Sequence, residues 1–206
     1  ITFDFVDDKN VVLEYCTTIG DKVKTGKVSL TYCNGENFPT MVEPATATLH
    51  ISLPGTVFRS VIEQSRNFIA IDELRPVMSA LCIDVAEDLS DVVFVATNTH
   101  ILYKRVLSND PAKGGYDFFR GGGSGKMLLH LDYFRTVYVL NDAEKVDIES
   151  DGHNIRIWTK DSEFTCKALE GKYPNYNSVI PRNNPYYITF DKKEMISVIK
   201  RVAMFS

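Results

Sequence analysis

The sequence predicts an α+β fold in which short antiparallel strands outnumber helices and similar domains follow one another along the chain. Three observations support this prediction. Runs that alternate between apolar and polar residues, or that are rich in β-branched residues, recur throughout the chain. Three other segments space their apolar residues as amphipathic helices do. Finally, the chain resembles itself at an offset of about 135 residues, a period that suits a whole domain.

The composition is that of an ordinary globular protein. Of the 206 residues, 44% are hydrophobic and 24% are charged, which is enough apolar material for a substantial core. The net charge of −4 excludes a protein that binds nucleic acid through bulk positive charge, although it leaves room for a local basic patch. No apolar run approaches the roughly 18 residues of a membrane span, and no signal peptide opens the chain, so we expect a soluble, cytoplasmic protein.

The predicted strands occupy most of the chain. Ile1, Phe3 and Phe5 alternate onto one face, and because the chain begins inside this strand, without a methionine, we expect it to be part of a longer protein. Further runs typical of strands lie at 11–15, 27–32, 47–51, 81–85, 92–97, 101–106, 127–129, 145–149, 154–159 and 163–168. Polar turns at 7–10 and 150–153 predict two hairpins. The stretch 108–125 is rich in glycine and predicts a mobile loop.

Three segments are predicted to be helices. Residues 53–70 place Pro54 in the first turn, and residues 131–140 have a mixed aromatic and aliphatic face. The third segment, 191–205, begins with Asp191 as N-cap and has a glutamate three residues later, which together form a capping box. The apolar stripe of this last helix consists of Met195, Val198, Ile199 and Val202.

The internal repeat relates two pairs of segments. Residues 28–39 align with residues 163–174, and the aromatic-proline pair that closes each segment recurs at a step of about 135. The strand and helix that follow, with Val61-Ile62 in the first copy and Val198-Ile199 in the second, recur at a step of about 137. The order of hairpin, aromatic-proline pair, strand and helix is the same both times. We therefore predict tandem domains, each with about two helices and eight short strands.

No motif of an enzyme active site is present. The glycine-rich segment 121–126 does not match a phosphate-binding loop, because Arg120 and Met127 stand where a glycine and a Ser or Thr are required. The four histidines lack the i,i+4 spacing of a helical zinc site, and no G-x-S-x-G turn occurs. We expect no catalytic residue, no metal site and no cofactor.

The four cysteines form no C-x-x-C pair. They are Cys16, Cys33, Cys82 and Cys166. Their wide, irregular spacing in strand-like runs favours reduced, partly buried thiols in a cytosolic protein, and a disulfide between two of them is the open alternative.

Three short motifs, taken in their order along the chain, closely resemble the middle domain of the bacterial sliding clamp, the DNA polymerase III beta subunit. They are LRPVMSAL at 74–81, VATNTHIL at 95–102, and LEGKYPNY at 169–176 followed by VIP at 179–181. The corresponding family patterns are R-P-V-L-x-G, V-A-T-D-G-H-R-L and E-G-x-F/Y-P-D-Y with V-I-P. The chain departs from the second pattern at Asn98, Thr99 and Ile101, where the family has Asp, Gly and Arg.

This resemblance implies a DNA-clamp fold, with two helices packed on antiparallel sheets in each repeated domain. Residues 1–45 would be the C-terminal part of clamp domain I, residues 46–180 the complete middle domain II, and residues 181–206 the start of domain III. It also implies a non-catalytic processivity factor of DNA replication, whose full-length chains form a homodimeric ring around duplex DNA without regard to sequence. The implied partners are the DNA polymerase III catalytic subunit, the clamp loader and other proteins with a clamp-binding motif. The resemblance implies no binding to a membrane.

The charges of the predicted helices fit a surface that faces DNA. Together, the segments 53–70, 130–141 and 189–206 carry seven Lys or Arg and four Asp or Glu, a net charge of +3 in a chain whose total is −4. A basic lining in an acidic body attracts phosphate without reading bases. The candidate DNA-binding residues are Arg59, Arg66, Arg75, Arg135, Lys200 and Arg201.

The resemblance further implies an apolar cleft that binds a short linear peptide of the partner proteins. The matching positions are Met78, Thr97, His100, Leu102, Pro174, Ser178 and Val179. Ser178 stands where the family often has arginine. Without the resemblance, the apolar members of this set would be assigned to the core.

Two other classes of function fit the sequence less well. A metal-dependent DNA-processing enzyme, either a nuclease or a nucleotidyl transferase, is disfavoured because no acidic metal-binding cluster is visible in the sequence. A β-rich binding module without contacts to DNA or to polymerase peptides is the third possibility.

Overall fold

The computed structural model describes residues 1–205 with the exception of 34, 39, 41–43, 45, 110–115, 122–124 and 135–143. The chain divides into two compact units, Ile1–Glu43 and Pro44–Ser206, and each is described by itself.

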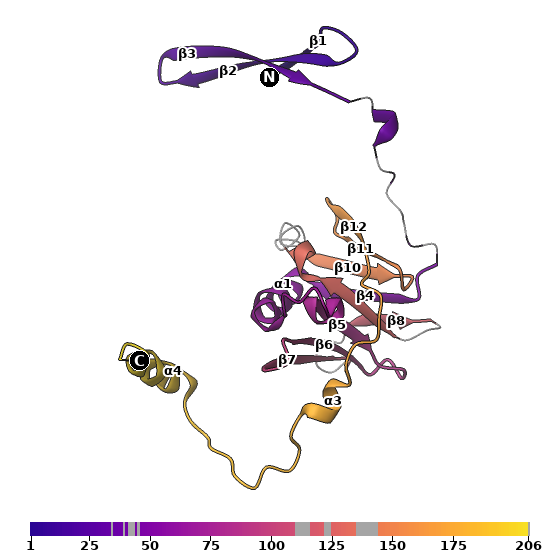
Figure 1. Ribbon diagram of the computed structural model, residues 1–206, viewed down its shortest axis with the longest axis vertical. Coiled ribbons are helices and arrows are strands. Elements are labelled where there is room, and N and C mark those ends of the chain that lie inside the picture. Colours follow the sequence, from indigo (N-terminus) through magenta and orange to yellow (C-terminus); the bar gives the residue numbers. More distant parts are fainter. Residues whose placement is uncertain are drawn as a thin grey trace. The chain divides into compact units, whose positions relative to one another are not determined.

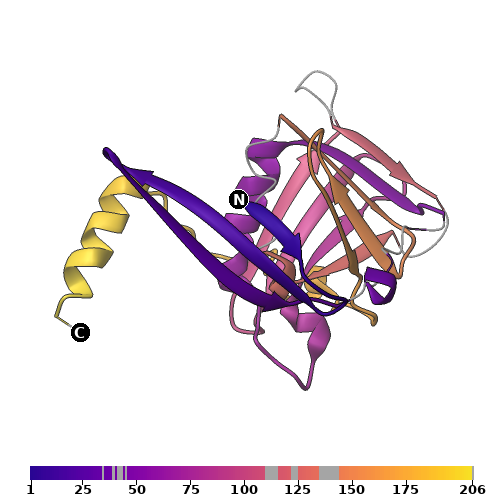
Figure 2. The ribbon, with the colours of Figure 1, turned by 90° about the horizontal axis from the view of Figure 1, so that it is seen from above.

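The first unit is a three-stranded antiparallel meander. Its strands are β1 (Thr2–Phe5), β2 (Asn10–Ile19) and β3 (Lys22–Thr31), followed by a short 3₁₀ helix, η1 (Gly35–Asn37). Gly20 has φ +60° in the tight turn between β2 and β3, a conformation that glycine adopts without strain. These two strands form the long twisted hairpin of Figure 2. Most of the apolar side chains of the sheet are exposed, including Phe3 and Phe5, and Val11 is buried.

The second unit contains two antiparallel sheets. The five-stranded sheet has the order β12-β11-β10-β4-β8, and the four-stranded sheet has the order β7-β6-β5-β9. The strands of the first sheet are β4 (Leu49–Pro54), β8 (Asp117–Arg120), β10 (Lys145–Ser150), β11 (Asn154–Trp158) and β12 (Glu163–Lys167). Those of the second sheet are β5 (Ala80–Val85), β6 (Asp91–Thr97), β7 (Leu102–Ser108) and β9 (Lys126–His130).

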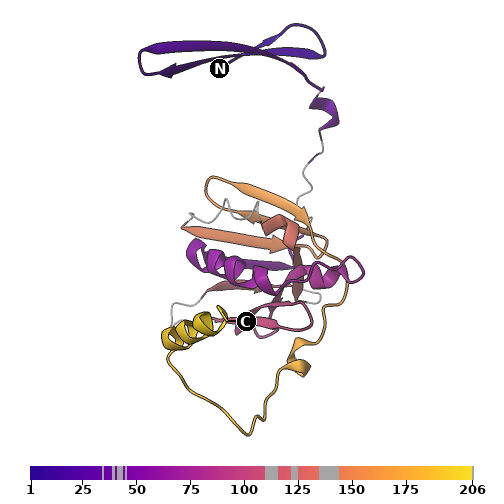
Figure 3. The same cartoon turned by 60° about the vertical axis from the view of Figure 1, so that its left-hand side comes forward.

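The main core lies between the two sheets and the helix α1 (Gly55–Ser65). Helix α1 lies against strands of both sheets, as Figures 1 and 3 show, and continues into the 3₁₀ turn η2 (Arg66–Phe68). Its side chains Phe58, Val61 and Ile62 are buried. They join apolar residues from every strand of the two sheets in one cluster. The α+β class with antiparallel sheets, predicted from the alternation of the sequence, is therefore confirmed.

The four-stranded sheet is covered on its outer face as well, by the segment 169–180. Successive residues of β5 point alternately to the main core and to this outer face, where Ala80 and Cys82 meet Tyr173 and Tyr176. Because both faces are covered, the first four residues of β5, from Ala80 to Ile83, are all apolar rather than alternating with polar residues. The covering segment includes the single helical turn α3 (Tyr176–Val179), which the sequence did not predict.

The prediction of a loop over 108–125 is wrong for residues 117–120. They form β8, which pairs with β4 from Leu49↔Arg120 to Ser52↔Asp117. The sequence prediction failed because this strand is short and its stability comes from pairing with a strand far away in the sequence. Residues 110–115 and 122–124 of this stretch lie outside the described residues.

The predicted helices are found with altered limits. Helix α1 begins two residues later than predicted, because Leu53 and Pro54 pair with β10 as the end of β4. Of the predicted helix 131–140, the structure describes the 3₁₀ turn η5 (Leu131–Tyr133) and Phe134, and the remainder lies outside the described residues. Helix α4 (Lys192–Val202) begins as predicted, since the Asp191 carboxylate accepts from the backbone N–H groups of residues 193 and 194. The strand that the repeat predicts at 188–190, one step of about 137 after residues 51–53, does not form: these residues are exposed and not in a strand.

All four cysteines are free thiols. Cys82 and Cys166 are buried, whereas Cys16 and Cys33 are exposed, so the expectation of burial is wrong for the two in the first unit. That meander has a single layer, which leaves its side chains open to solvent. Among the described residues, no helix is long and apolar enough to cross a membrane.

Candidate functional site

A pocket of about 420 Å³ opens where three segments that are distant in the sequence meet on the second unit. The segments are the 3₁₀ turn η3 (Pro76–Ser79) with the residues before it, the turn between β6 and β7, and the strip from 174 to α3. The lining residues are Arg75, Val77, Met78, Thr97, Thr99, His100, Ile101, Leu102, Pro174, Asn175, Tyr176 and Val179. Most of its surface is apolar, and a few polar groups stand at its edge. Such a lining suits a ligand anchored by an apolar group.

The first wall is formed by η3 and its approach. Pro76 opens this turn in the position where a proline costs no hydrogen bond. Asp72 braces the approach, because its carboxylate accepts from the backbone N–H groups of Leu74 (3.0 Å) and Arg75 (3.2 Å) and pairs with the Arg75 guanidinium at 2.7 Å. The hydrogen bond from Arg75 is the main cause that lowers the pKa of Asp72. Met78 is only 4% exposed and contributes to the core as well as to the pocket.

The second wall is the turn that joins β6 to β7. The Thr97 hydroxyl donates to the Ile101 carbonyl at 2.7 Å and accepts from the Thr99 N–H at 3.1 Å. The Asn98 side-chain oxygen accepts from the N–H groups of residues 100 and 101, at 3.1 and 3.0 Å, so asparagine performs the turn-closing role that an aspartate could perform here. Thr99 has φ +78°, which is rare for a β-branched residue and is typical of a functional turn.

The third wall is the segment that crosses the outer face of the four-stranded sheet. Tyr176, the first residue of α3, is buried, and its hydroxyl donates to the Asp84 carboxylate at 3.0 Å. Burial, followed by the negative charge of Asp84, raises the pKa of Tyr176 to about 12, so the phenol keeps its proton at neutral pH. Val179, at the other end of α3, is 67% exposed at the pocket edge.

The structure brings together six of the seven residues that the sequence assigned to the cleft. They are Met78, Thr97, His100, Leu102, Pro174 and Val179. Ser178 does not line the pocket: its hydroxyl donates to the Asn175 carbonyl at 2.7 Å, and the residue borders a neighbouring shallow, polar hollow. The sequence missed several wall residues, among them Val77, Asn175 and Tyr176, although all three lie inside the quoted motifs and could have been found there.

The candidate DNA-binding residues are distributed over three places. Arg59 and Arg66 lie on the solvent-facing side of α1 and just after it, and Arg59 pairs with Glu63 at 2.9 Å. Lys200 and Arg201 lie in the last turn of α4, none of whose side chains is buried. Arg75 is on neither helix and lines the pocket. Arg135 lies outside the described residues.

Within the described part of the chain, no three His, Cys, Asp or Glu side chains come close enough together to hold a metal ion. The buried thiols are poor nucleophiles at neutral pH, because burial raises the pKa of Cys82 and of Cys166 to about 12.

No protein-family model matches the chain, but individual proteins do. The beta sliding clamp of Pseudomonas aeruginosa is 27% identical over 186 residues, which is 89% of this chain and 48% of that protein. The beta sliding clamp of Bacillus subtilis is 26% identical over 158 residues, which is 76% of this chain and 39% of that protein. The chain therefore spans at most about half the length of these relatives.

Solved structures agree with these sequence matches. The sliding clamp of Bacillus subtilis aligns with 99% of this chain at a TM-score of 0.75 and 17% identity, over 49% of its own chain. A sliding clamp of Pseudomonas aeruginosa bound to griselimycin aligns with 97% of this chain at a TM-score of 0.74 and 21% identity, also over 49% of its chain. The fold is thus that of the DNA sliding clamps. More particularly, the curated relatives are the beta sliding clamps of bacteria, and the resemblance seen in the three motifs is confirmed over most of the chain.

Proposed function

We propose that the chain is part of a processivity factor of DNA replication, a sliding clamp that encircles duplex DNA and tethers the replicative polymerase. The pocket is the observation that carries this proposal, because three separated motifs of the clamp resemblance supply its walls. A shared pocket explains why these motifs occur together, whereas a purely structural role does not explain it. The pocket is apolar and open at one side, as expected for a site that takes the anchor residues of a short peptide.

The occupants of this pocket would be peptides of the DNA polymerase III catalytic subunit, of the clamp loader and of other clamp-binding proteins. Leucine or phenylalanine anchors would contact Met78, Leu102 and Val179, while Thr97 and His100 supply polar groups at the edge. Met78 can adapt to different anchors because its thioether chain is flexible. In this proposal the factor is cytoplasmic and non-catalytic.

The domain assignment proposed for the chain is 1–45, 46–180 and 181–206, as the last part of one clamp domain, a complete middle domain and the start of a third. The boundary between the two compact units, after Glu43, supports the first division. The repeat supports the second: Val61 and Ile62 of α1 are buried, whereas the corresponding Val198 and Ile199 of α4 are 39% and 58% exposed. Helix α4 would bury this stripe on the sheets of its own domain. Two full-length chains would then close a homodimeric ring.

A peptide titration tests the pocket assignment. The probe is a fluorescein-labelled octapeptide with leucine and phenylalanine near its C-terminus, and its alanine-substituted version is the control ligand. Binding is measured by fluorescence anisotropy, and NMR amide shifts locate the site. We expect weak binding that first perturbs residues 97–102 and 174–179, because a following domain would supply a further wall.

Val179→Asp and Ser178→Asp form a matched pair for this experiment. Val179 is 67% exposed, so the new charge should leave the fold unchanged, whereas Met78 is 4% exposed and a charge there would also disturb the core. Val179→Asp should weaken binding of the peptide at least about tenfold, because it buries an unpaired carboxylate against an apolar anchor of the peptide. Ser178→Asp, one residue away and outside the pocket, should bind as the unmodified chain does. Equal affinities of the two variants, or shifts confined to 108–125, would refute the assignment.

A further inference from the structure

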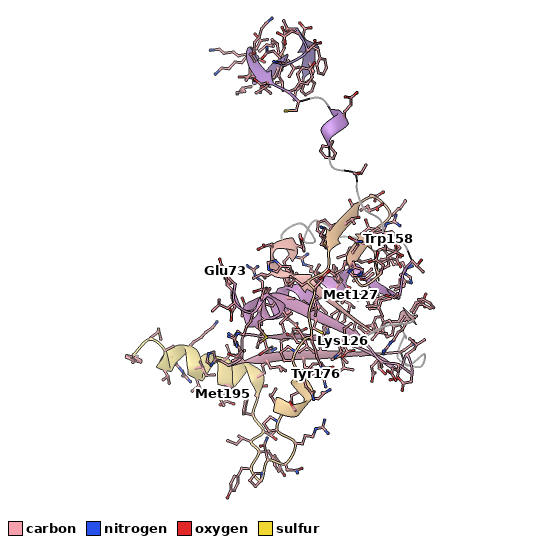
Figure 4. All side chains as sticks on the ribbon, turned by 45° about the vertical axis from the view of Figure 1, so that its right-hand side comes forward. Glu73, Lys126, Met127, Trp158, Tyr176 and Met195 are labelled. Atoms are coloured by element: carbon pink, nitrogen blue, oxygen red, sulfur yellow. The ribbon has the colours of Figure 1, made fainter. Side chains whose placement is uncertain are left out.

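Tyr176 is held on the outer face of the four-stranded sheet by charged groups from three strands. Its hydroxyl donates to Asp84 Oδ2 of β5 at 3.0 Å, and the same oxygen accepts from Lys126 Nζ of β9 at 2.8 Å. The ammonium groups of Lys104, on β7, and of Lys126 each lie 5.4 Å from the centre of the Tyr176 ring. Figure 4 labels Tyr176 and Lys126, whose proximity these distances describe. The ring is thus flanked by two cations and tied to one carboxylate.

The register of the sheet explains how these groups come together. Asp84 follows Ala80 and Cys82 on the outer face of β5, and it pairs directly with Lys126 of β9. The side chain of Asp84 is 18% exposed and that of Lys126 is 37% exposed, so the ion pair is partly shielded from solvent. A hydrogen bond to a charged acceptor in such a place is stronger than one on an open surface.

This cluster acts on the pocket through α3. Tyr176 begins α3, and Pro174, Asn175 and Val179 on either side of it line the pocket. Lys104 extends the attachment, because its ammonium group donates to the Asn177 side chain at 3.2 Å. A helix of one turn has little stability of its own, so the position of this wall depends on what holds it to the sheet.

Tyr173 provides a contrast within the same segment. It is buried in the same apolar cluster, yet its hydroxyl interacts with backbone groups, those of Val95 (3.5 Å) and Thr97, and the residue borders a different pocket, beside Lys172 and His153. The two tyrosines therefore differ in attachment, and the strongly attached one is the one in the wall of the candidate peptide pocket.

We propose that Asp84 and Lys126 are positioning residues, which hold Tyr176 and thereby α3 in the place that the pocket requires for its ligand. This inference rests on the peptide-binding function proposed above. Neither residue lines the pocket. Asp84 and Lys126 would therefore affect ligand binding indirectly, through the position of α3 in the third wall.

The test compares Tyr176→Phe and Asp84→Asn with Tyr173→Phe as the matched control. Each change keeps the size of the side chain, and the two tyrosine variants each remove one buried hydroxyl. The first measurement is NMR hydrogen exchange of the Ser178 amide, which donates to the Asn175 carbonyl at 3.2 Å. Losing a hydrogen bond to a charged group should speed its exchange by about tenfold or more in Tyr176→Phe, and Tyr173→Phe should change it by less than about twofold.

Two further measurements separate positioning from general stability. Exchange of β5 and β6 amides should remain within about twofold in all variants, because a local loosening does not unfold the sheet. Tyr176→Phe removes the hydroxyl that donates to Asp84, and Asp84→Asn removes the negative charge of its acceptor. Because both changes weaken one interaction, their effects in the double variant Tyr176→Phe/Asp84→Asn should be smaller than the sum of the two single effects. Uniform acceleration across the chain, or equal effects of the two tyrosine variants, would overturn the proposal.

The labelled octapeptide then supplies a binding readout. We expect Tyr176→Phe to raise its dissociation rate about tenfold and Tyr173→Phe to leave it unchanged. Unchanged dissociation in Tyr176→Phe, with binding by the unmodified chain intact, overturns the positioning role alone. If the unmodified chain fails to bind the octapeptide, the pocket function fails, and with it the positioning of a ligand-binding wall, whatever the exchange rates show.

Discussion

Replacing Gly171 by alanine should lower the free energy of unfolding for two separate structural reasons. It lies in the segment that crosses the outer face of the four-stranded sheet, and its φ is +132°, a conformation that residues with a side chain rarely adopt. A Cβ atom at this position would lie 2.7 Å from Cγ1 of Val77. Carbon atoms in contact are normally about 3.5–4.0 Å apart, so the added methyl group would overlap Val77 by about 1 Å.

The expected loss in the free energy of unfolding is the sum of these two effects. The backbone conformation costs about 1–3 kcal/mol for a residue with a side chain. Forcing a methyl group into occupied space adds about 1–3 kcal/mol. Gly171→Ala should therefore lose about 2–6 kcal/mol. Gly152 isolates the first effect, because its φ is +95° and nothing lies within 4 Å of a Cβ built there. Gly152→Ala should lose only the backbone part, about 1–3 kcal/mol.

Urea denaturation followed by circular dichroism measures both losses. The gain from restricting the unfolded chain is the same for both alanine variants and cancels in their comparison. A double-mutant cycle with Val77→Ala adds a direct test, because removing Cγ1 should recover most of the steric part in the Gly171→Ala background. If the two glycine variants lose the same free energy, or if Val77→Ala recovers none of it, the steric argument is wrong.

Three other predictions concern DNA, the thiols and acid. In the ring-closed clamp that we propose, Arg59→Ala and Arg66→Ala together should weaken retention on DNA without sequence preference, and each lost phosphate contact should reduce the slope of log affinity against log salt by about 0.9. Lys167→Gln, which removes an exposed charge of β12, serves as control and should leave the slope unchanged. An unchanged slope in the arginine variant contradicts the assignment. Because burial raises the pKa of Cys82 and Cys166 to about 12, iodoacetamide at neutral pH should label only the two exposed cysteines of the native chain, as mass spectrometry can show. The pKa of Asp72 is lowered from its ordinary value of 3.8, so its contribution to stability is present above about pH 4 and is lost as the pH falls through the lowered pKa. A carboxyl NMR titration should show a lowered midpoint for Asp72, and replacing Arg75 by alanine should return that midpoint toward 3.8.

The sequence alone determined the features that depend on neighbouring residues. Period-two alternation located most strands, and the polar turn at 150–153 gave the β10–β11 hairpin that the structure contains. The cap of α4 was also readable, because Asp191 bonds to N–H groups only two and three residues away. The motifs identified six of the residues that meet in the pocket, and this came from resemblance, since apolar side chains in a wall and in a core look the same in a sequence.

Only the tertiary structure decided the features that join distant segments. Strand β8 forms by pairing with the edge of β4, and residues 117–120 are too short a run to mark a strand by themselves. The exposure of Cys16 follows from the single layer of the meander, and Cys33 is exposed beyond the end of β3. Likewise, the hydrogen bond between Asp84 and Tyr176 spans 92 positions of the chain. Such contacts form when strand pairing fixes the register of the sheet, so their partners are set by the fold and not by proximity in the sequence.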